Sequence, residues 1–296
     1  MNVTGNSNVG GLVGINDETA SYVGEINYAA DVNGAYGGSV ISVTARNQYA
    51  GGIVGYLKSG RIAGEDNGNY IKSYAKVKAD NYAGGIVGYM PAGIEGVAIA
   101  YSENCGTVTA GNKFAGGIVS VNDNNLITYS NNCGDVSASF GYAGGIVSVN
   151  KNGGGIKYCK VYSDSDKGVT ITSTMEAGGA VAAVNQQGSL VMDCTVSTSI
   201  KGHNVSVVGS KLKNIGYMVG VNEGIISGGQ VLENVGYHTS AKEITLGGIA
   251  GYNKPKAVVK NIGTNTATAH KVVLVNNGNI KYLGGVVGDN EGSVTE

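Results

Sequence analysis

The sequence predicts an all-β protein, a parallel β-helix (β-solenoid) of about nine coils, each of roughly 28–41 residues. A glycine-flanked apolar octet, YAGGIVGY, supports this fold class because it stands at Tyr49–Tyr56, recurs unchanged at Tyr82–Tyr89 and has looser copies along the chain. The composition is the second observation. Gly accounts for 51 of 296 residues and Tyr for 18, whereas Trp is absent and Phe occurs twice. An elongated body, whose coils each bury a thin apolar layer, can form without the bulky residues that a compact core usually contains.

Nine copies of the unit can be aligned on the first Gly of each pair. The spacings between them, 41, 33, 32, 28, 35, 37, 31 and 37 residues, indicate a fixed rung connected by loops of different length. We therefore expect residues 1–296 to form a single solenoid of these repeats. The aligned glycines are Gly10, Gly51, Gly84, Gly116, Gly144, Gly179, Gly216, Gly247 and Gly284.

Each copy has the same kinds of residue at fixed positions. Counted from the first Gly, the third and fourth positions are apolar throughout, the fifth is Gly, Ser or Ala, and the seventh is Asn in seven of nine copies. Such columns predict parallel strands stacked about 4.8 Å apart, because one coil cannot bury its apolar face alone. The Gly pair suits a corner where φ is positive or where a side chain would collide with the next coil. The Asn suits a turn and can hydrogen-bond along its own ladder.

Two adjacent apolar columns raise the question of which one faces the interior, because alternate residues of a strand point to opposite sides. We expect the third and fifth positions, such as Ile86 and Gly88, to face inward. The fourth position, such as Val87, is then expected to be covered by a loop or to be half-exposed.

Charge and hydropathy exclude several classes of partner. The net charge is −1 and the charged residues are scattered singly, so no basic field exists for nucleic acid or anionic lipid. No apolar run approaches the length of a membrane span. The first residues, MNVTGNSNVGG, lack the basic and apolar regions of a signal peptide. The chain is therefore either cytosolic or a piece of a longer protein; the repeats favour the second, with the segment acting as a monomer within that longer chain.

The residue types that usually bind metals or carry catalysis form no recognised motif. His203, His238 and His270 lie in no HExxH motif and near no Cys pair, so solvated loop positions are expected for them. Asp164 and Asp166, in SDSDKG, could hold calcium, but the remaining EF-hand ligands are missing and a solvated loop is favoured. We predict no catalytic residue, no cofactor and no metal.

The four cysteines occur in what look like equivalent half-repeats. Cys105, Cys133, Cys159 and Cys194 are separated by 28, 26 and 35 residues, which matches no zinc site. We expect them to be buried as small apolar side chains. Free thiols are predicted, because neighbouring parallel rungs seldom offer the torsion of a disulfide.

Aromatic residues precede the Gly pair in five of the nine copies. In the simpler interpretation they pack along the outside of the corner. In the functional interpretation they form a strip on which a glycan or a protein partner stacks. The loops that vary most, Asp17–Arg46 and Lys151–Met175, are further candidates for binding. The five possible ligand-stacking residues are Tyr49, Tyr82, Phe114, Tyr142 and Tyr282.

The rung, as in GGLVGIN and AGGIVGYM, and the half-repeats YSENCGTVTAG and YSNNCGDVSAS resemble the GLUG motif. The resemblance covers most of the chain, is clearest over residues 45–195 and departs over 199–246, where Tyr217 replaces the second Gly. GLUG repeats occur in large secreted or surface-attached bacterial proteins, including adhesin-like proteins and the non-catalytic regions of some immunoglobulin A peptidases. The resemblance implies an extracellular or cell-surface location and a scaffold that brings no catalytic residue.

The repeats and the lack of catalytic motifs favour a non-enzymatic structural and interaction module, a stalk or adhesin segment that binds a host glycan or host protein. The alternative is a carbohydrate-active β-helix enzyme or a polysaccharide-binding domain. Such an enzyme needs clustered carboxylates, whereas the 21 acidic residues are spread over the nine coils. Ice binding would need a flat column of Thr, and the segments GVTITST and NTATAH do not fall in one column.

Overall fold

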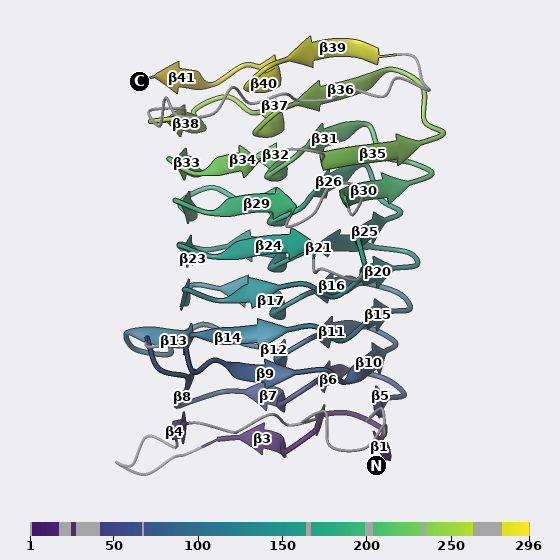
Figure 1. The fold of residues 1–296 in the computed structure, drawn as a ribbon, viewed down its shortest axis with the longest axis vertical. Helices are drawn as coiled ribbons and strands as arrows, with labels where there is room; N and C mark the ends of the chain where they lie inside the picture. The colour runs from purple at the N-terminus through teal and green to yellow at the C-terminus, as the bar shows by residue number, and fades with distance from the viewer. Residues whose placement is uncertain are drawn as a thin grey trace.

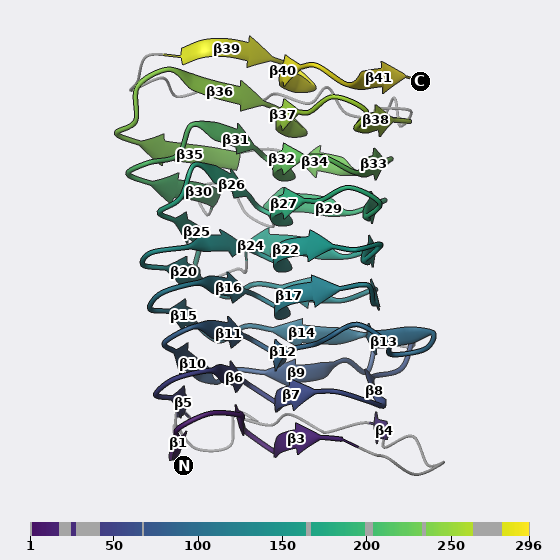
Figure 2. The ribbon, with the colours of Figure 1, turned by 180° about the vertical axis from the view of Figure 1, so that it is seen from behind.

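The computed structural model describes residues 2–17, 25–27, 42–66, 68–163, 167–198, 204–232, 235–262 and 280–295. Within these ranges the chain forms strands β1 to β41 and no helix, and every strand pair is parallel. The strands wind into a solenoid with β1 and β41 at opposite ends of its long axis (Figures 1 and 2). The fold class predicted from the sequence is therefore confirmed. No helix among the described residues is long and apolar enough to cross a membrane.

Five parallel sheets run along the axis, and each complete coil contributes one short strand to each sheet. Sheet A contains β1 (Asn2–Gly5), β5 (Ser42–Ala45), β10 (Lys76–Ala79), β15 (Val108–Ala110), β20 (Val136–Ala138), β25 (Val169–Ser173), β30 (Val205–Gly209) and β35 (Val235–Thr239). Sheet B contains β2 (Val9–Gly10), β6 (Tyr49–Gly51), β11 (Tyr82–Gly84), β16 (Phe114–Gly116), β21 (Tyr142–Gly144), β26 (Ala177–Gly179), β31 (Asn214–Gly216), β36 (Ile244–Gly247) and β39 (Ile280–Gly284). Sheet C contains β3 (Val13–Asn16), β7 (Val54–Leu57), β12 (Val87–Tyr89), β17 (Val119–Asp123), β22 (Val147–Lys151), β27 (Ala182–Asn185), β32 (Val219–Asn222), β37 (Ala250–Asn253) and β40 (Val287–Asn290).

Sheets D and E complete the cross-section. Sheet D contains β4 (Glu25–Asn27), β8 (Arg61–Ala63), β13 (Val97–Ala100), β18 (Leu126–Thr128), β23 (Gly155–Lys157), β28 (Leu190–Met192), β33 (Ile225–Ser227), β38 (Val258–Lys260) and β41 (Ser293–Thr295). Sheet E contains β9 (Ile71–Ser73), β14 (Ser102–Asn104), β19 (Asn131–Asn132), β24 (Lys160–Ser163), β29 (Thr195–Thr198) and β34 (Gln230–Leu232). We number the coils 1 to 9 by their strands in sheet B.

The repeated Gly-Gly-aliphatic segments lie directly above one another. The aligned first glycines pair in register from β2 to β39. The backbone N–H of Ile86 donates to the carbonyl of Ile118, and that of Ile118 donates to Ile146, both at 3.0 Å. These contacts are the parallel rungs that the octet predicts. The loops differ in length, yet the aligned first glycines stay paired in every coil.

The Gly pair is required by close approach between coils and not by a positive φ, so the second of the two predicted reasons applies. A Cβ on Gly117 would lie 1.9 Å from the carbonyl oxygen of Gly145 on the next coil. A Cβ on Gly116 would lie 1.9 Å from the carbonyl oxygen of Val119 within the same bend. Neither Gly116 nor Gly117 has a positive φ. A Cβ on Gly117 would thus press on the next coil and one on Gly116 on its own bend. Coils 6 and 7 have Ala180 and Tyr217 at the second position and keep their hydrogen bonds to the neighbouring coils.

The expected orientation of the apolar columns is wrong. The third and fourth positions, such as Ile86 and Val87, are both fully buried in the main core. The fifth points to the outside of the bend, where the Ser120 hydroxyl donates to the carbonyl of Gly88 and Ala183 joins a separate outer cluster. The strict alternation fails because the chain bends at Gly85–Ile86, between β11 and β12. Each fully buried Ile contributes about 1.5–3 kcal/mol relative to an exposed one.

The Asn column forms a continuous hydrogen-bonded ladder inside the solenoid, as the sequence predicts. The side-chain amides donate from coil to coil at 2.7–2.9 Å, from Asn122 through five further residues to Asn290. The ladder stops at Asn122, because the neighbouring coil has Met90 at this position and the buried Oδ1 of Asn122 has no partner. The members between these ends are Asn150, Asn185, Asn222 and Asn253.

The prediction that all four cysteines are free thiols is wrong. Cys105 and Cys133 form a disulfide between adjacent coils, with their Cα atoms 4.7 Å apart. Cys159 and Cys194 are free, buried and adjacent to each other, in a column three residues earlier in the coil. The four cysteines are therefore not equivalent positions of one half-repeat. The disulfide forms because parallel stacking brings the Cα atoms of neighbouring coils within disulfide range. Burial, and then Cys194, raise the pKa of the Cys159 thiol.

Candidate functional site

The outer faces of sheets B and C meet at an angle along the whole solenoid, because the chain bends at each Gly pair. Two columns of side chains face each other across this angle. One stands two residues before the first Gly, at the start of the sheet B strands, and the other is the sixth position, in sheet C. In coil 2 these are Tyr49 and Tyr56, whose ring centroids are 5.3 Å apart. The size of the residues in the two columns determines whether the angle is filled or open.

The aromatic row predicted from the sequence lies in the first column. Tyr49, Tyr82, Phe114 and Tyr142 pair in register on β6, β11, β16 and β21, and their successive ring centroids are 5.1, 5.6 and 6.2 Å apart. Tyr282 occupies the same column but pairs with Thr245, so three non-aromatic coils separate it from the others. The structure thus brings together four of the five predicted residues. A role for them in binding stays a prediction.

Coils 2 and 3 have tyrosines in both columns, so the angle is closed there. Tyr89 packs against Tyr49 at 4.9 Å, against Tyr82 at 5.4 Å and against Tyr56 at 5.8 Å between ring centroids. Burial, followed by the nearby Asp123 carboxylate and the neighbouring tyrosines, raises the pKa of Tyr89 to about 12. These rings present a filled surface and leave no space for a ligand between the two sheets.

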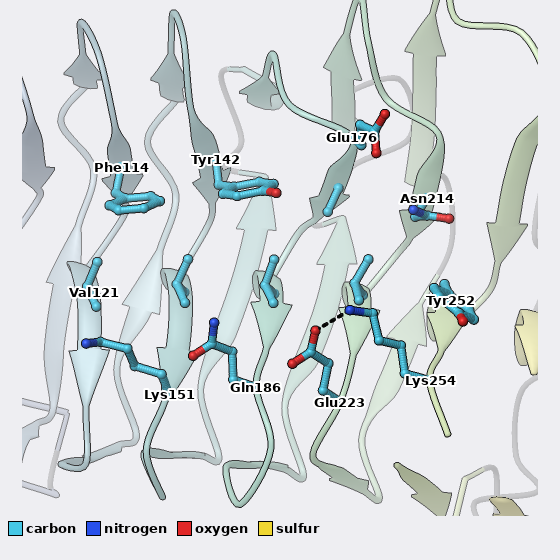
Figure 3. Close-up of a pocket in the computed structure, with 14 residues that line it drawn as sticks. Phe114, Val121, Tyr142, Lys151, Glu176, Gln186, Asn214, Glu223, Tyr252 and Lys254 are labelled. Atoms are coloured by element: carbon cyan, nitrogen blue, oxygen red, sulfur yellow. Dashed lines mark hydrogen bonds and ion pairs between the residues drawn. The ribbon is translucent and has the colours of Figure 1, made fainter. Parts of the chain in front are cut away.

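Further along the axis the first column changes to small residues and a cavity of about 560 Å³ opens between the sheets (Figure 3). We call it the trough. Ala177 in coil 6 and Asn214 in coil 7 stand where coils 2 to 5 have an aromatic ring. Valines of the sixth column form the floor, Phe114 and Tyr252 stand toward opposite ends, and Tyr142 lies next to Phe114. The lining residues are Phe114, Val121, Tyr142, Val149, Lys151, Glu176, Ala177, Val184, Gln186, Asn214, Val221, Glu223, Tyr252 and Lys254.

Charged side chains line the rim of the trough and are paired with neighbours on adjacent coils. Lys254 pairs with Glu223 within the trough (Figure 3). Lys151 pairs with Asp123 at 2.7 Å, and Lys213 pairs with Glu176 at 2.8 Å. Burial acts to raise the pKa of Asp123, but hydrogen bonds from Lys151 and Asn152 outweigh it, so the pKa of Asp123 is lowered overall. The two lysines and two glutamates of the lining therefore carry compensating charges.

The two tyrosines near the ends of the trough are held by different interactions. Tyr142 packs on the valine cluster and its ring is parallel, within 3°, to that of Phe114. Burial is the main cause that raises its pKa. The Tyr252 hydroxyl donates to Glu291 at 2.7 Å, and this hydrogen bond raises the pKa of Tyr252 to about 12. Both hydroxyls thus remain protonated at neutral pH and can act as donors or acceptors.

The trough combines several kinds of polar group with an apolar surface. Its lining contains amide, hydroxyl, carboxylate and ammonium groups over an apolar floor, and it contains no Cys, His or Ser. In the described ranges no cluster of three or more His, Cys, Asp or Glu side chains is placed to hold a metal ion. Such a combination of a mainly apolar surface with a few polar groups is typical of ligand sites.

Of the other residues singled out in the sequence, few can be placed. Asp164 and Asp166 lie outside the described residues, as do His203 and His270. His238 is exposed, as expected, but it lies in strand β35 and not in a loop. Of the two variable loops, Asp17–Arg46 is described only in part, and Lys151 at the start of the second loop belongs to the rim of the trough.

Sequence reasoning missed a second aromatic column, at the corner between sheets D and E. Tyr101, Tyr129 and Tyr158 stack on successive coils with centroids 5.0 and 4.9 Å apart, and we call them the tyrosine stack. All three have a positive φ, between 46° and 56°, which is uncommon for a bulky residue. Tyr129 and Tyr158 are about two-fifths exposed. The recurrence of Tyr before Ser or Cys in YSEN, YSNN and YCKV is the signal that could have revealed it.

Comparisons with known proteins give a partial structural match and no family. No family model and no curated protein matches the chain, so the GLUG resemblance stays a prediction. A solved structure described as a "putative immunoglobulin A1 protease" from Bacteroides ovatus aligns with 85 % of this chain and 79 % of its own. The two chains are 14 % identical, and the TM-score of the alignment is 0.37.

Proposed function

We propose that this chain is a non-enzymatic structural and interaction module, a stalk or adhesin segment of a bacterial surface or secreted protein. The trough between sheets B and C carries the proposal: on a scaffold that repeats coil after coil, it arises where small residues replace the aromatic row, and its lining is suited to binding. The GLUG resemblance supports the location outside the cell or on its surface. The ligand is a host glycan or a host protein, because both combine apolar faces with hydrogen-bonding groups.

The alternative function, a carbohydrate-active enzyme, has one observation in its favour. Two carboxylates, Glu176 and Glu223, line the same trough. A glycosidase needs one carboxylic acid that donates a proton and a second carboxylate that acts as base or nucleophile. Here each carboxylate forms an ion pair with a lysine, Lys213 or Lys254. A carboxylate held in this way is better suited to accept hydrogen bonds from a ligand than to donate a proton, so binding without turnover is favoured.

A paired binding and turnover assay tests the proposal. The purified chain is applied to a glycan array and to immobilised host extracellular proteins, and the same glycans are assayed for release of reducing or unsaturated ends. The proposal predicts saturable binding without release of ends. Turnover that is lost in Glu176→Gln or Glu223→Gln would overturn it in favour of the enzyme. Absence of binding to every glycan and every protein would also overturn the interaction role.

A further inference from the structure

We infer that the trough binds a neutral oligosaccharide, extended along the solenoid axis over about three to four sugar units. This inference rests on the proposed function and names its ligand class and site. It depends on three features of the described residues: the length of the trough, the composition of its floor and end walls, and the pairing of its charges. Each feature narrows the class of ligand in turn.

The trough is elongated along the axis. Its lining runs from Phe114 of coil 4 to Tyr252 of coil 8, which are four coil spacings apart, or about 19 Å at 4.8 Å per spacing. The backbone groups of sheets B and C are hydrogen-bonded between coils, so they offer no free edge to an added strand. A linear ligand must therefore be recognised by side chains that repeat at the coil spacing. A sugar chain presents a ring at each comparable step, whereas an extended peptide is recognised mainly through its backbone.

The floor and the end walls are apolar surfaces of the kind on which pyranose rings stack. Val184 and Val221 form the floor with Ala177, and these residues belong to one outer cluster. Tyr142 and Tyr252 pack against the same cluster. Tyrosine combines an apolar ring face with a polar hydroxyl, which suits a ligand that has C–H faces and hydroxyl edges. The apolar contacts alone would accept many ligands, so the polar rim must provide the selectivity.

The rim favours a ligand without net charge. Each of its four charged side chains already has a partner of opposite sign, so an anionic or cationic ligand would have to break an ion pair to gain one. Gln186 and Asn214 add amides that both donate and accept. Hydroxyl groups also donate and accept, and can join such a network without displacing an ion. A neutral sugar therefore satisfies the rim, whereas sialylated or sulfated sugars do not.

The chain itself provides a variant that should close the trough without damaging the fold. Ala177→Tyr restores the residue type that Tyr49, Tyr82 and Tyr142 place at the same position of their coils. The new ring would occupy the space above Val184, as the rings of coils 2 and 3 occupy theirs. Tyr129→Ala is the matched control, because it removes an exposed ring from the tyrosine stack at another corner.

The experiment measures binding of neutral linear tri- and tetrasaccharides of glucose, galactose and mannose by calorimetry and ligand-observed NMR, beside sialylated and sulfated glycans of the same length. The inference predicts that at least one neutral glycan binds, that Ala177→Tyr weakens it tenfold or more while the melting temperature is retained, and that Tyr129→Ala changes affinity less than twofold.

The outcomes distinguish this inference from the broader proposal. Tight binding of only sialylated or sulfated glycans, or glycan binding that Ala177→Tyr leaves intact, would overturn the inference while the interaction role stands. Binding of a host protein alone would have the same consequence. Hydrolysis of the bound glycan would overturn the non-enzymatic function while the trough remains the sugar site. Should Ala177→Tyr fail to fold, Asn214→Tyr one coil further provides the same test.

Discussion

Coils 2 to 5 and coils 6 to 8 present the same two columns to the angle between sheets B and C, but with side chains of different size. In the first segment, which we call the filled half, aromatic rings occupy the column before the Gly pair, and its last two coils, 4 and 5, also line one end of the trough. In the second, the open half, Ala177 and Asn214 leave the trough. The backbone register is the same in both. The repeated Gly-Gly-aliphatic segment therefore determines the backbone fold. The outward-facing positions at which the repeat changes determine the shape of the surface between the two sheets.

The largest expected effect concerns the register that both halves share. Gly117→Val places a side chain where a Cβ alone would lie 1.9 Å from the carbonyl oxygen of Gly145, so the coils must separate. We expect a loss of about 3 kcal/mol or more in the free energy of unfolding, or failure to fold, since overpacking of this kind cannot be relieved by a rotamer change. Urea denaturation followed by circular dichroism measures it.

Gly285→Val is the matched control for this prediction. It substitutes the same position of coil 9, where a Cβ would meet no atom within 4 Å. We expect a change below about 0.5 kcal/mol, as for an ordinary surface site. Equal losses for Gly117→Val and Gly285→Val would show that close approach between coils does not explain the glycine columns.

The next expected effect concerns the Asn ladder, which begins within the filled half and continues through the open half. Asn150 accepts from Asn122 and donates to Asn185, so Asn150→Leu leaves buried groups unsatisfied on both sides. We expect a loss of about 2–3 kcal/mol. Asn122→Leu should cost about 1 kcal/mol, because the Oδ1 of Asn122 has no partner and the preceding coil already has Met90 there. Chemical denaturation of both variants measures the difference, and equal losses would contradict a ladder with a defined end.

The aromatic row should contribute more to stability inside the filled half than at its border with the trough. Tyr82 contacts Tyr49, Tyr89 and Phe114, whereas Tyr142 contacts only Phe114 among the aromatic residues described. Each aromatic pair is worth about 0.5–1.5 kcal/mol beyond burial. We therefore expect Tyr82→Ala to cost about 2 kcal/mol and Tyr142→Ala about 1 kcal/mol in thermal or urea unfolding. A larger loss for Tyr142→Ala would contradict this assignment of the two halves.

Much of the fold could be predicted from the sequence, because the same residue types recur at equivalent positions of successive coils. The parallel rungs, the Gly corners and the Asn ladder all follow from columns such as Ile86, Ile118 and Ile146. Which of the third, fourth and fifth positions face the core could not be predicted. Their orientation depends on the bend at Gly85 and Ile86, which interrupts the alternation of side chains along a strand. The disulfide was not predicted, although the half-repeats YSENCG and YSNNCG align Cys105 with Cys133, because the torsion that a bond between stacked cysteines needs cannot be read from the sequence.

The trough was only half visible in the sequence. The aromatic row was found because it repeats, but the site lies where that repetition fails, at Ala177 and Asn214, which look unremarkable in isolation. The charged rim was missed for a related reason. Its lysines and glutamates stand on different coils, 31 to 37 residues apart in the chain, and become neighbours only through stacking. A column-by-column comparison of outward positions is therefore the procedure that would find such sites in related solenoids.

The smallest expected effect concerns two tyrosines, one in each half, whose pKa values are raised for different reasons. The pKa of Tyr89 is raised to about 12 mainly by burial among the packed rings, and that of Tyr252 to about 12 mainly by its hydrogen bond to Glu291. Alkaline titration of tyrosinate absorbance should thus show late-titrating groups, of which Tyr89→Phe removes one and Tyr252→Phe another. Because both pKa values are raised above that of the unfolded chain, the associated stability is present below pH 10 and is lost as the pH rises toward 12.

Glu291→Gln distinguishes the two causes. It removes the negative charge next to Tyr252, so the pKa of Tyr252 should fall toward 10 while that of Tyr89 stays near 12. Comparison with Tyr89→Phe and Tyr252→Phe assigns each transition to its residue. If Glu291→Gln shifted both transitions, the tyrosines of the filled half would be coupled to charges at the far end of the trough. If it shifted neither, the hydrogen bond to Glu291 would not determine the ionisation of Tyr252, and packing alone would have to hold the ring in both halves.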